Sequence, residues 1–214
     1  MNDYTKVESK QYPNVIMRVI PGHFVTPHAH INYYVDLTPL KCRVKEAQAT
    51  AQALSEIHYF STPVDTIVAM EGTEMIGGFL AEDLTRAGVM CLNAHKSLYV
   101  VSPEFTSDGQ IIFRDNLITW IRGKNVLLLL ATATTGKTIG QAVESLKYYG
   151  ATISGISAIF STATKVGGLP VYSVFTQKDL PDYKAYPSDA CPMCRDKVPV
   201  DAIANAYGYT PLTK

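Results

Sequence analysis

The feature that most constrains the fold is one continuous stretch, residues 126–149. It opens with the apolar run 126–131, passes through a loop rich in small and hydroxyl-bearing residues, and leads directly into a helical pattern at 139–149. A short, wholly apolar run bounded by such a loop is typical of a strand buried on both faces in an α/β protein. We therefore expect a central strand, a loop and a helix here.

The loop itself suggests phosphate binding. A helix start leaves several backbone N–H groups unpaired and carries a partial positive charge. Gly136 would permit close approach of an anion, and threonine hydroxyls would add donors. The alternative is that Thr134 or Thr135 only caps the helix. The predicted phosphate-binding residues are Thr132, Ala133, Thr134, Thr135, Gly136, Lys137 and Thr138.

Strand and helix patterns alternate along most of the chain. This alternation predicts an α/β fold with a mostly parallel twisted sheet and helices on both faces. Residues 14–36 form a separate small β-rich lobe in this prediction. The expected strands are 66–69, 89–92, 97–101, 151–160 and 171–175, the expected helices are 44–57 and 77–86, and residues 103–123 form an irregular segment with a short hairpin.

Composition narrows the partners. Lys and Arg total 19, as do Asp and Glu, and neither sign forms a long run. This balance argues against nucleic acid and membrane partners and favours a small phosphate-bearing ligand. The polar N-terminus and the short apolar runs predict a cytoplasmic protein.

No metal site is assigned from the sequence. Cys191 and Cys194 form a single CxxC pair, and a four-cysteine zinc site would have to recruit the distant Cys42 and Cys91. His28 and His30 lie two apart in an extended segment without an obvious carboxylate as third ligand. A ligand-facing or surface role is therefore expected for the histidines, and free thiols for the cysteines.

Two families have loops of this kind. With Ala131 in place of the first glycine, residues 131–138 fit a relaxed Walker A pattern, in which Lys137 would reach β- and γ-phosphates. The strand at 153–160, however, ends in Ser161 and Thr162 and not in the metal-binding Asp that such an enzyme needs. A P-loop-type nucleotide-binding protein is kept as an alternative.

The second family is the type I phosphoribosyltransferases. Residues 134–138, Thr-Thr-Gly-Lys-Thr, closely resemble the second half of that family's motif for the 5′-phosphate of phosphoribosyl pyrophosphate. The order of segments 22–36, 65–81, 148–160 and 172–180 is similar to orotate phosphoribosyltransferases in particular. The resemblance implies an N-terminal segment and hood at 1–40, an α/β core at 41–185 and a C-terminal extension at 186–214.

The resemblance also implies further site residues and a homodimer. The pyrophosphate loop would comprise Met70, Glu71, Gly72 and Thr73, and the base or hood region His28, Asn32, Tyr33 and Tyr34.

Three segments depart from the family pattern. Leu130 and Ala131 stand where the family has an acidic pair that holds the ribose hydroxyls and helps to organise Mg²⁺. Residues 101–109 contain no Lys or Arg to neutralise pyrophosphate, although Arg114 could supply an anion contact. The hood segment 26–30, Thr-Pro-His-Ala-His, replaces the usual Ser-Gly element.

These departures shape the functional prediction. We expect an orotate phosphoribosyltransferase-like protein that binds a ribose-5-phosphate-type ligand or nucleotide, with phosphoribosyl transfer weakened or altered and a weak case for a Mg²⁺ cofactor. No catalytic residue is assigned. The main alternative is a non-catalytic, nucleotide-sensing regulatory module.

Overall fold

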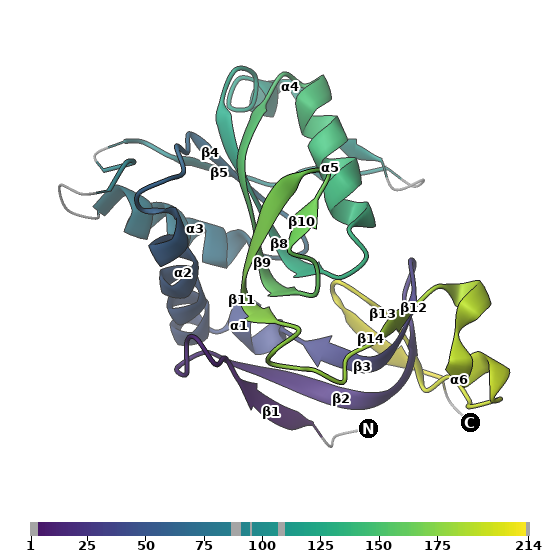
Figure 1. Cartoon of the computed structure of the whole chain (residues 1–214). Coiled ribbons are helices and arrows are strands. Elements are labelled where there is room, and N and C mark those ends of the chain that lie inside the picture. Colours follow the sequence, from purple (N-terminus) through teal and green to yellow (C-terminus); the bar gives the residue numbers. More distant parts are fainter. Residues whose placement is uncertain (1–3, 87–90, 95, 107–109, 213–214) are drawn as a thin grey trace.

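The structure is a computed structural model, and it describes residues 4–86, 91–94, 96–106 and 110–212. It contains a central sheet flanked by helices and a second sheet beneath it (Figure 1). We call the second sheet the hood sheet. Both ends of the described chain lie on the side of the hood sheet.

The central sheet is parallel except at one edge. Its strand order is β10-β11-β9-β8-β4-β5, and only β10 runs antiparallel to its neighbour. The strands are β4 (Thr66–Ala69), β5 (Tyr99–Val101), β8 (Asn125–Ala133), β9 (Thr152–Ser161), β10 (Lys165–Val166) and β11 (Leu169–Thr176). Residues 126–131 of β8 are at most 2% exposed, as expected for a strand covered on both faces.

Helices cover both faces of this sheet. On one face lie α1 (Thr38–Cys42), α2 (Val44–His58) and α3 (Glu74–Arg86), and on the other lie α4 (Asp115–Ile118) and α5 (Lys137–Tyr148). The predicted α/β class, with a mostly parallel sheet between helices, is confirmed. The predicted helix 44–57 matches α2 to within one residue, whereas α3 starts three residues before the predicted 77.

The hood sheet is built from both ends of the chain. Its order is β12-β3-β2-β13-β14, and β1 pairs with β2. The strands are β1 (Thr5–Glu8), β2 (Ile16–Val25), β3 (His30–Asp36), β12 (Ala185–Tyr186), β13 (Ala202–Asn205) and β14 (Gly208–Pro211). Strand β13 buries Ala202 and Ala204 in the same cluster as Phe24 of β2. The C-terminal extension, with η1 (Ser188–Ala190) and α6 (Pro192–Arg195), therefore completes the hood.

Two expected segments either differ from the structure or lie partly outside the residues that it describes. Of the expected strand 89–92, residues 89 and 90 lie outside the described residues, and Cys91 and Leu92 lie in a loop and turn. The short strands β6 (Glu104–Phe105) and β7 (Ile111–Ile112) pair antiparallel on either side of residues 107–109, which are not described.

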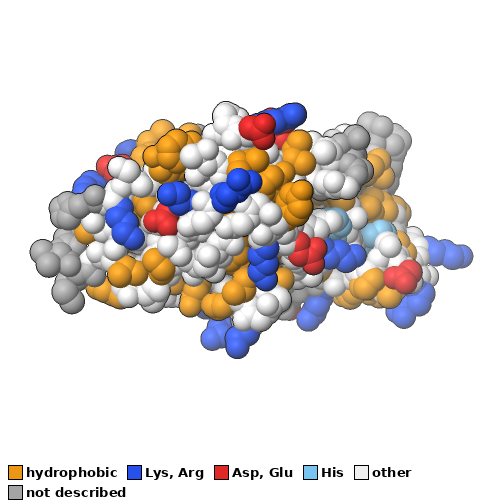
Figure 2. Space-filling view, turned by 90° about the horizontal axis from the view of Figure 1, so that it is seen from above, with side chains coloured by type: hydrophobic (Ala, Val, Ile, Leu, Met, Phe, Trp, Pro, Cys, Tyr) orange, Lys and Arg blue, Asp and Glu red, His pale blue; other side chains and the backbone are white. Residues whose placement is uncertain are grey.

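The surface in Figure 2 carries basic and acidic side chains interspersed with apolar ones, and this face shows no broad field of one sign. That distribution agrees with the equal totals of basic and acidic residues. Among the described residues, no helix combines the length and hydropathy needed to span a membrane.

A buried histidine joins α2 to the central sheet. His58 is fully buried, its Nδ1 lies 2.9 Å from Thr62 Oγ1, and its Nε2 lies 2.6 Å from Ser157 Oγ on β9. Burial lowers the pKa of His58 from its ordinary value to about 4. The imidazole is therefore neutral in the folded protein well below the pH at which an exposed histidine takes up a proton.

This pKa predicts an acid-sensitive fold. Between a pH of about 6.5 and a pH of about 4, His58 takes up a proton in the unfolded chain but not in the folded chain. The free energy of unfolding should therefore decrease as the pH is lowered through this window, by up to about 3 kcal/mol. Urea unfolding at several pH values, compared with His58→Gln, measures the contribution. The variant should be less stable near pH 7 and should lose less stability on acidification. Parallel pH curves for the two proteins would contradict the assignment.

Candidate functional site

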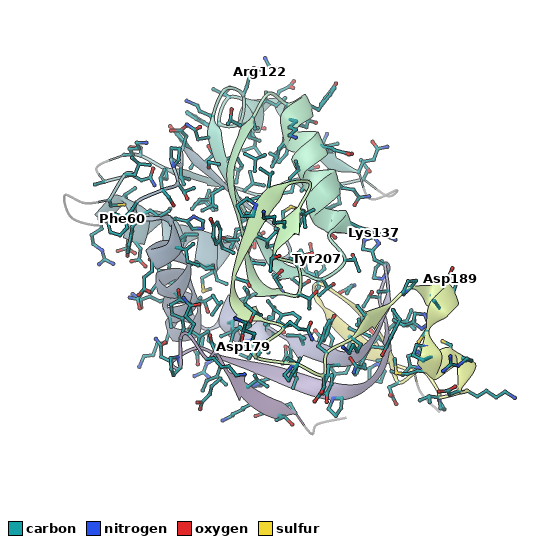
Figure 3. The ribbon with its side chains drawn as sticks, in the orientation of Figure 1. Phe60, Arg122, Lys137, Asp179, Asp189 and Tyr207 are labelled. Atoms are coloured by element: carbon teal, nitrogen blue, oxygen red, sulfur yellow. The ribbon has the colours of Figure 1, made fainter. Side chains whose placement is uncertain are left out.

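A cavity of about 660 Å³ lies between the central sheet and the hood sheet, at the carboxyl ends of β4, β8 and β9. In open parallel sheets this edge is the usual place for a ligand. Its walls come from the loop after β8, the hood turn 26–28 with β3, the helix α1, and residues 204–207, which comprise the end of β13 and its turn to β14. Figure 3 shows Tyr207 between the hood and the core.

Residues 132–138, which run from the end of β8 through a short loop into the first turn of α5, form one wall of the cavity, to which all of them except Lys137 contribute. Gly136 is the residue before α5, and its φ of 73° lies in the left-handed region that favours glycine. Within the residues that the structure describes, no side chain caps the helix. The expected alternative of a threonine cap therefore does not describe this loop, and the first N–H groups of α5 have no side-chain acceptor.

The threonine hydroxyl groups of residues 134–138 differ in whether they have a hydrogen-bond partner. The Thr134 side chain hydrogen-bonds Tyr183, a residue whose pKa burial raises to about 12. Thr135 and Thr138 line the cavity, and their hydroxyls make no hydrogen bond to any residue within the described ranges. These two hydroxyls and the uncapped helix start are donors available to an anion.

Glu71 places a carboxylate against the end of β8. Its Oε2 accepts hydrogen bonds from the backbone N–H groups of Ala131, at 3.0 Å, and Thr132, at 3.1 Å. Strand β4 ends opposite Leu129, so the next N–H groups of β8 have no partner from β4. Glu71 lines the cavity and holds a φ of 59°, which is strained for a residue with a side chain.

The surroundings of Glu71 act on its carboxyl in opposite directions. Burial raises the pKa of Glu71, while the two backbone hydrogen bonds and the nearby Lys41 ammonium oppose that rise. This carboxyl is the acidic group of the cavity wall within the described residues.

Lys41 on α1 is the ammonium of the cavity wall. Its Nζ donates to the carbonyl oxygens of Glu71, at 2.9 Å, and Ala206, at 2.8 Å. Burial lowers the pKa of Lys41, with the charge of Glu71 the largest opposing influence. The side chain thus joins three segments, α1, the loop after β4 and the β13–β14 turn.

Comparison with curated proteins finds orotate phosphoribosyltransferases. The chain is 24% identical over 198 residues to the enzyme of Chlorobium phaeobacteroides, covering 90% of this chain and 92% of that enzyme. It is also 24% identical over 189 residues to the enzyme of Thermus thermophilus, covering 86% of this chain and 93% of that enzyme. No family model matches the chain.

Solved structures extend this likeness to the fold. Orotate phosphoribosyltransferase of Mycobacterium tuberculosis aligns with a TM-score of 0.52 at 18% identity over 77% of this chain and 92% of that one. A phosphoribosyltransferase of Corynebacterium diphtheriae aligns with a TM-score of 0.51 at 21% identity over 76% and 90%. The chain has the type I phosphoribosyltransferase fold. Leishmania donovani UMP synthase, with a TM-score of 0.55 at 17% identity, covers 76% of this chain and 34% of its own.

In this phosphoribosyltransferase fold the predicted site residues divide into two groups. The first group lines the cavity; it comprises Thr132, Ala133, Thr134, Thr135, Gly136, Thr138, Glu71, His28 and Tyr34. The second group lies elsewhere; it comprises Lys137, Met70, Gly72, Thr73, Asn32, Tyr33 and Arg114.

The second group has other contacts. Lys137 is exposed at the start of α5 (Figure 3), and Met70 is buried in the apolar core. Asn32 exchanges hydrogen bonds with the backbone of residues 182 and 184. Arg114 donates two hydrogen bonds to Glu104 Oε2, at 3.0 and 2.6 Å, on an exposed surface.

Sequence reasoning missed part of the cavity wall. Lys41, Phe105, Tyr183 and the turn 204–207 all line it. Lys41 lies in the last turn of the short helix α1, and residues 204–207 reach the cavity only because β13 pairs with β2. No local signal in the sequence would have identified these residues.

The Glu71 contact predicts a specific stability effect. Glu71→Ala should lower the free energy of unfolding by about 1–3 kcal/mol, because it leaves two N–H groups of β8 without an acceptor. Glu71→Gln should lose much less, since the amide oxygen can accept the same bonds. Urea unfolding of both variants measures the difference, with exposed Glu144→Ala on α5 as the control. Equal stability of Glu71→Ala and the parent would contradict this role.

Proposed function

We propose that the cavity binds a ribose-5-phosphate-type ligand, either phosphoribosyl pyrophosphate or a nucleotide, with its 5′-phosphate at residues 134–138. The observation that carries the proposal is the uncapped start of α5, opening into the cavity with two unengaged threonine hydroxyls. The orotate phosphoribosyltransferase resemblance and the shared fold support this ligand class.

The physical basis for phosphate binding is local. The first turn of α5 offers backbone N–H donors, and the aligned peptide dipoles favour negative charge at that end. Gly136 adopts a backbone conformation that a side chain would strain. Thr135 and Thr138 add hydroxyl donors on the cavity side. A phosphate monoester can use all of these donors at once.

Glu71 takes part of the role of the missing acidic pair in this proposal. Its Oε2 is held by β8, and its Oε1 accepts no hydrogen bond from the described residues. That free oxygen can accept a ribose hydroxyl. A single carboxylate in place of two leaves a weaker site for Mg²⁺, which prefers several oxygen ligands.

The same cavity offers little to a leaving pyrophosphate. Lys41 is the Lys or Arg side chain that lines it among the described residues, and its ammonium is engaged by two carbonyl oxygens. Arg114 is paired with Glu104 outside the cavity. Transition-state charge is therefore poorly stabilised, and we propose that phosphoribosyl transfer is weak or altered.

The second candidate function, a non-catalytic nucleotide sensor, is favoured by the same scarcity of cations. A sensor would bind the same ligand at the same phosphate site as the enzyme but would not turn it over. The P-loop alternative is disfavoured, because Lys137 is exposed and outside the cavity wall. A homodimer and a cytoplasmic location remain predictions.

The phosphate site predicts which threonines matter. Thr135→Val and Thr138→Val should each weaken binding of inorganic phosphate, orotidine monophosphate and phosphoribosyl pyrophosphate by about tenfold, since each removes a donor worth about 1–2 kcal/mol to a charged oxygen. Isothermal titration calorimetry measures this. Thr152→Val, at the opposite end of β9, is the control and should bind like the parent. If the parent binds none of the three ligands at millimolar concentration, the proposal is refuted.

Gly136 is a less clean probe than the threonines. A Cβ there would lie 3.2 Å from Val166 Cγ2, and the positive φ strains any side chain. Gly136→Val would therefore disturb the loop itself as well as any anion.

Turnover separates the two functions that share the site. A pyrophosphate-release assay with Mg²⁺, phosphoribosyl pyrophosphate and a panel of bases should give slow release that Thr138→Val reduces. Binding without release for every base would favour the sensor.

A further inference from the structure

Outside the cavity, four metal-binding side chains converge where the C-terminal extension crosses the hood sheet. His23 comes from β2, His30 from β3, Cys191 from the residue before α6, and Cys194 from α6 itself. Their ligand atoms all lie within 4.8 Å of one another. His23 and Cys191 are buried, His30 is half-buried and Cys194 is exposed. We call these residues the Cys-His cluster.

Four distances between ligand atoms of the cluster are close to those around a tetrahedral ion. His23 Nε2 lies 3.0 Å from His30 Nδ1, 3.7 Å from Cys191 Sγ and 3.6 Å from Cys194 Sγ. Cys194 Sγ lies 3.2 Å from His30 Nδ1. Tetrahedral zinc, with ordinary bond lengths to nitrogen and sulfur, would set N···N near about 3.3 Å and N···S near about 3.5 Å.

The buried histidine is oriented as a metal ligand. His23 Nδ1 lies 3.0 Å from the carbonyl oxygen of Val198, to which it can donate its proton. That bond leaves a lone pair on Nε2, the atom that faces the other three ligands. A hydrogen bond from the second ring nitrogen is the usual way in which proteins orient a histidine on a metal.

The two cysteines are presented by one tight turn. Backbone bonds from Arg195 N to Cys191 O and from Lys197 N to Cys194 O close the segment around the CxxC pair. Lys197 takes a positive φ of 57° as the chain leaves the turn. The turn therefore places both thiols close to the two histidines.

We propose that His23, His30, Cys191 and Cys194 bind a structural Zn²⁺ ion. Two thiolates and two imidazoles are the donor set that zinc takes in tetrahedral structural sites. Four protein ligands complete the coordination, so no position is left for a substrate. The role is therefore structural.

The site would fasten the C-terminal extension to the hood. The backbone N–H of His23 donates to Asp201 Oδ2, and the backbone N–H of Asp201 donates to the carbonyl oxygen of His23. Strand β13 follows, and its turn with β14 supplies residues 204–207 of the cavity wall. The ion would hold one wall of the cavity in place without touching a ligand there.

Two metal-free arrangements compete with this proposal. Cys191 and Cys194 could form a disulfide, and the two histidines could share a proton across their 3.0 Å contact. Metal content and thiol accessibility together distinguish these arrangements from zinc.

The test uses the full chain without a histidine tag, expressed with zinc in the medium and purified without chelator. Mass spectrometry of the metal should find about one zinc per chain. Cys194→Ser and His30→Gln should each lower the zinc content at least severalfold. Cys42→Ser and His28→Gln, which change the same residue types outside the cluster, should keep it.

Two further readouts use the parent alone, so the test does not depend on the variants folding. Replacement of zinc by Co²⁺ should give the visible absorption of a tetrahedral ion and a thiolate-to-cobalt charge-transfer band. Alkylation of Cys191 and Cys194 should be slow until a chelator is added. Absence of zinc, a disulfide in the zinc-grown protein, or full zinc in both cluster variants would overturn the proposal.

Discussion

Strand β8 lies between two apolar clusters, and its side chains alternate between them. Leu127, Leu129 and Ala131 pack with α1 to α3 and the hood, while Leu128 and Leu130 pack with α5. Burying one such leucine contributes about 1.5–3 kcal/mol, so register slippage of this strand would be costly. The strand therefore fixes where its own carboxyl end emerges, and with it the loop 132–138 and the start of α5.

Positions 130 and 131 of β8, where the resemblance would place an acidic pair, carry apolar side chains. Leu130 is fully buried in an apolar cluster, where a carboxylate would lack a partner, whereas Ala131 is 2% exposed and lines the cavity. The N–H groups at the end of β8 still need an acceptor, because β4 has already ended. Glu71, from the loop after β4, reaches across and supplies it. The carboxylate at the end of β8 therefore comes from the loop after β4, and the positive φ of Glu71 is local backbone strain at this contact.

The sequence predicts the parts of the structure that depend on neighbours along the chain. The α/β class, β8 and the loop into α5 follow from periodicity and from small residues at a strand end. The Cys-His cluster does not, because His23 and Cys191 are 168 residues apart. Period-two reasoning paired His28 with His30, but the chain turns at 26–29, so His28 lies in the turn. A register shift between Pro21 and Phe24 then lets His23 face His30 from the adjacent strand.

Lys41 shows how far the cavity depends on such distant contacts. A buried ammonium loses much of its hydration, and this loss is tolerable only where oxygen atoms replace the water. Here the oxygens are the carbonyls of Glu71 and Ala206, the second 165 residues away in the C-terminal hairpin. If the β13–β14 hairpin moved away from α1, Lys41 would lose the carbonyl oxygen of Ala206 as an acceptor. The strained loop that carries Glu71 would then be held less firmly, because its contact with Lys41 would be weakened. The hood strands, the C-terminal extension and the carboxylate at the end of β8 are therefore held as one connected set, and a ligand in the cavity would contact all three.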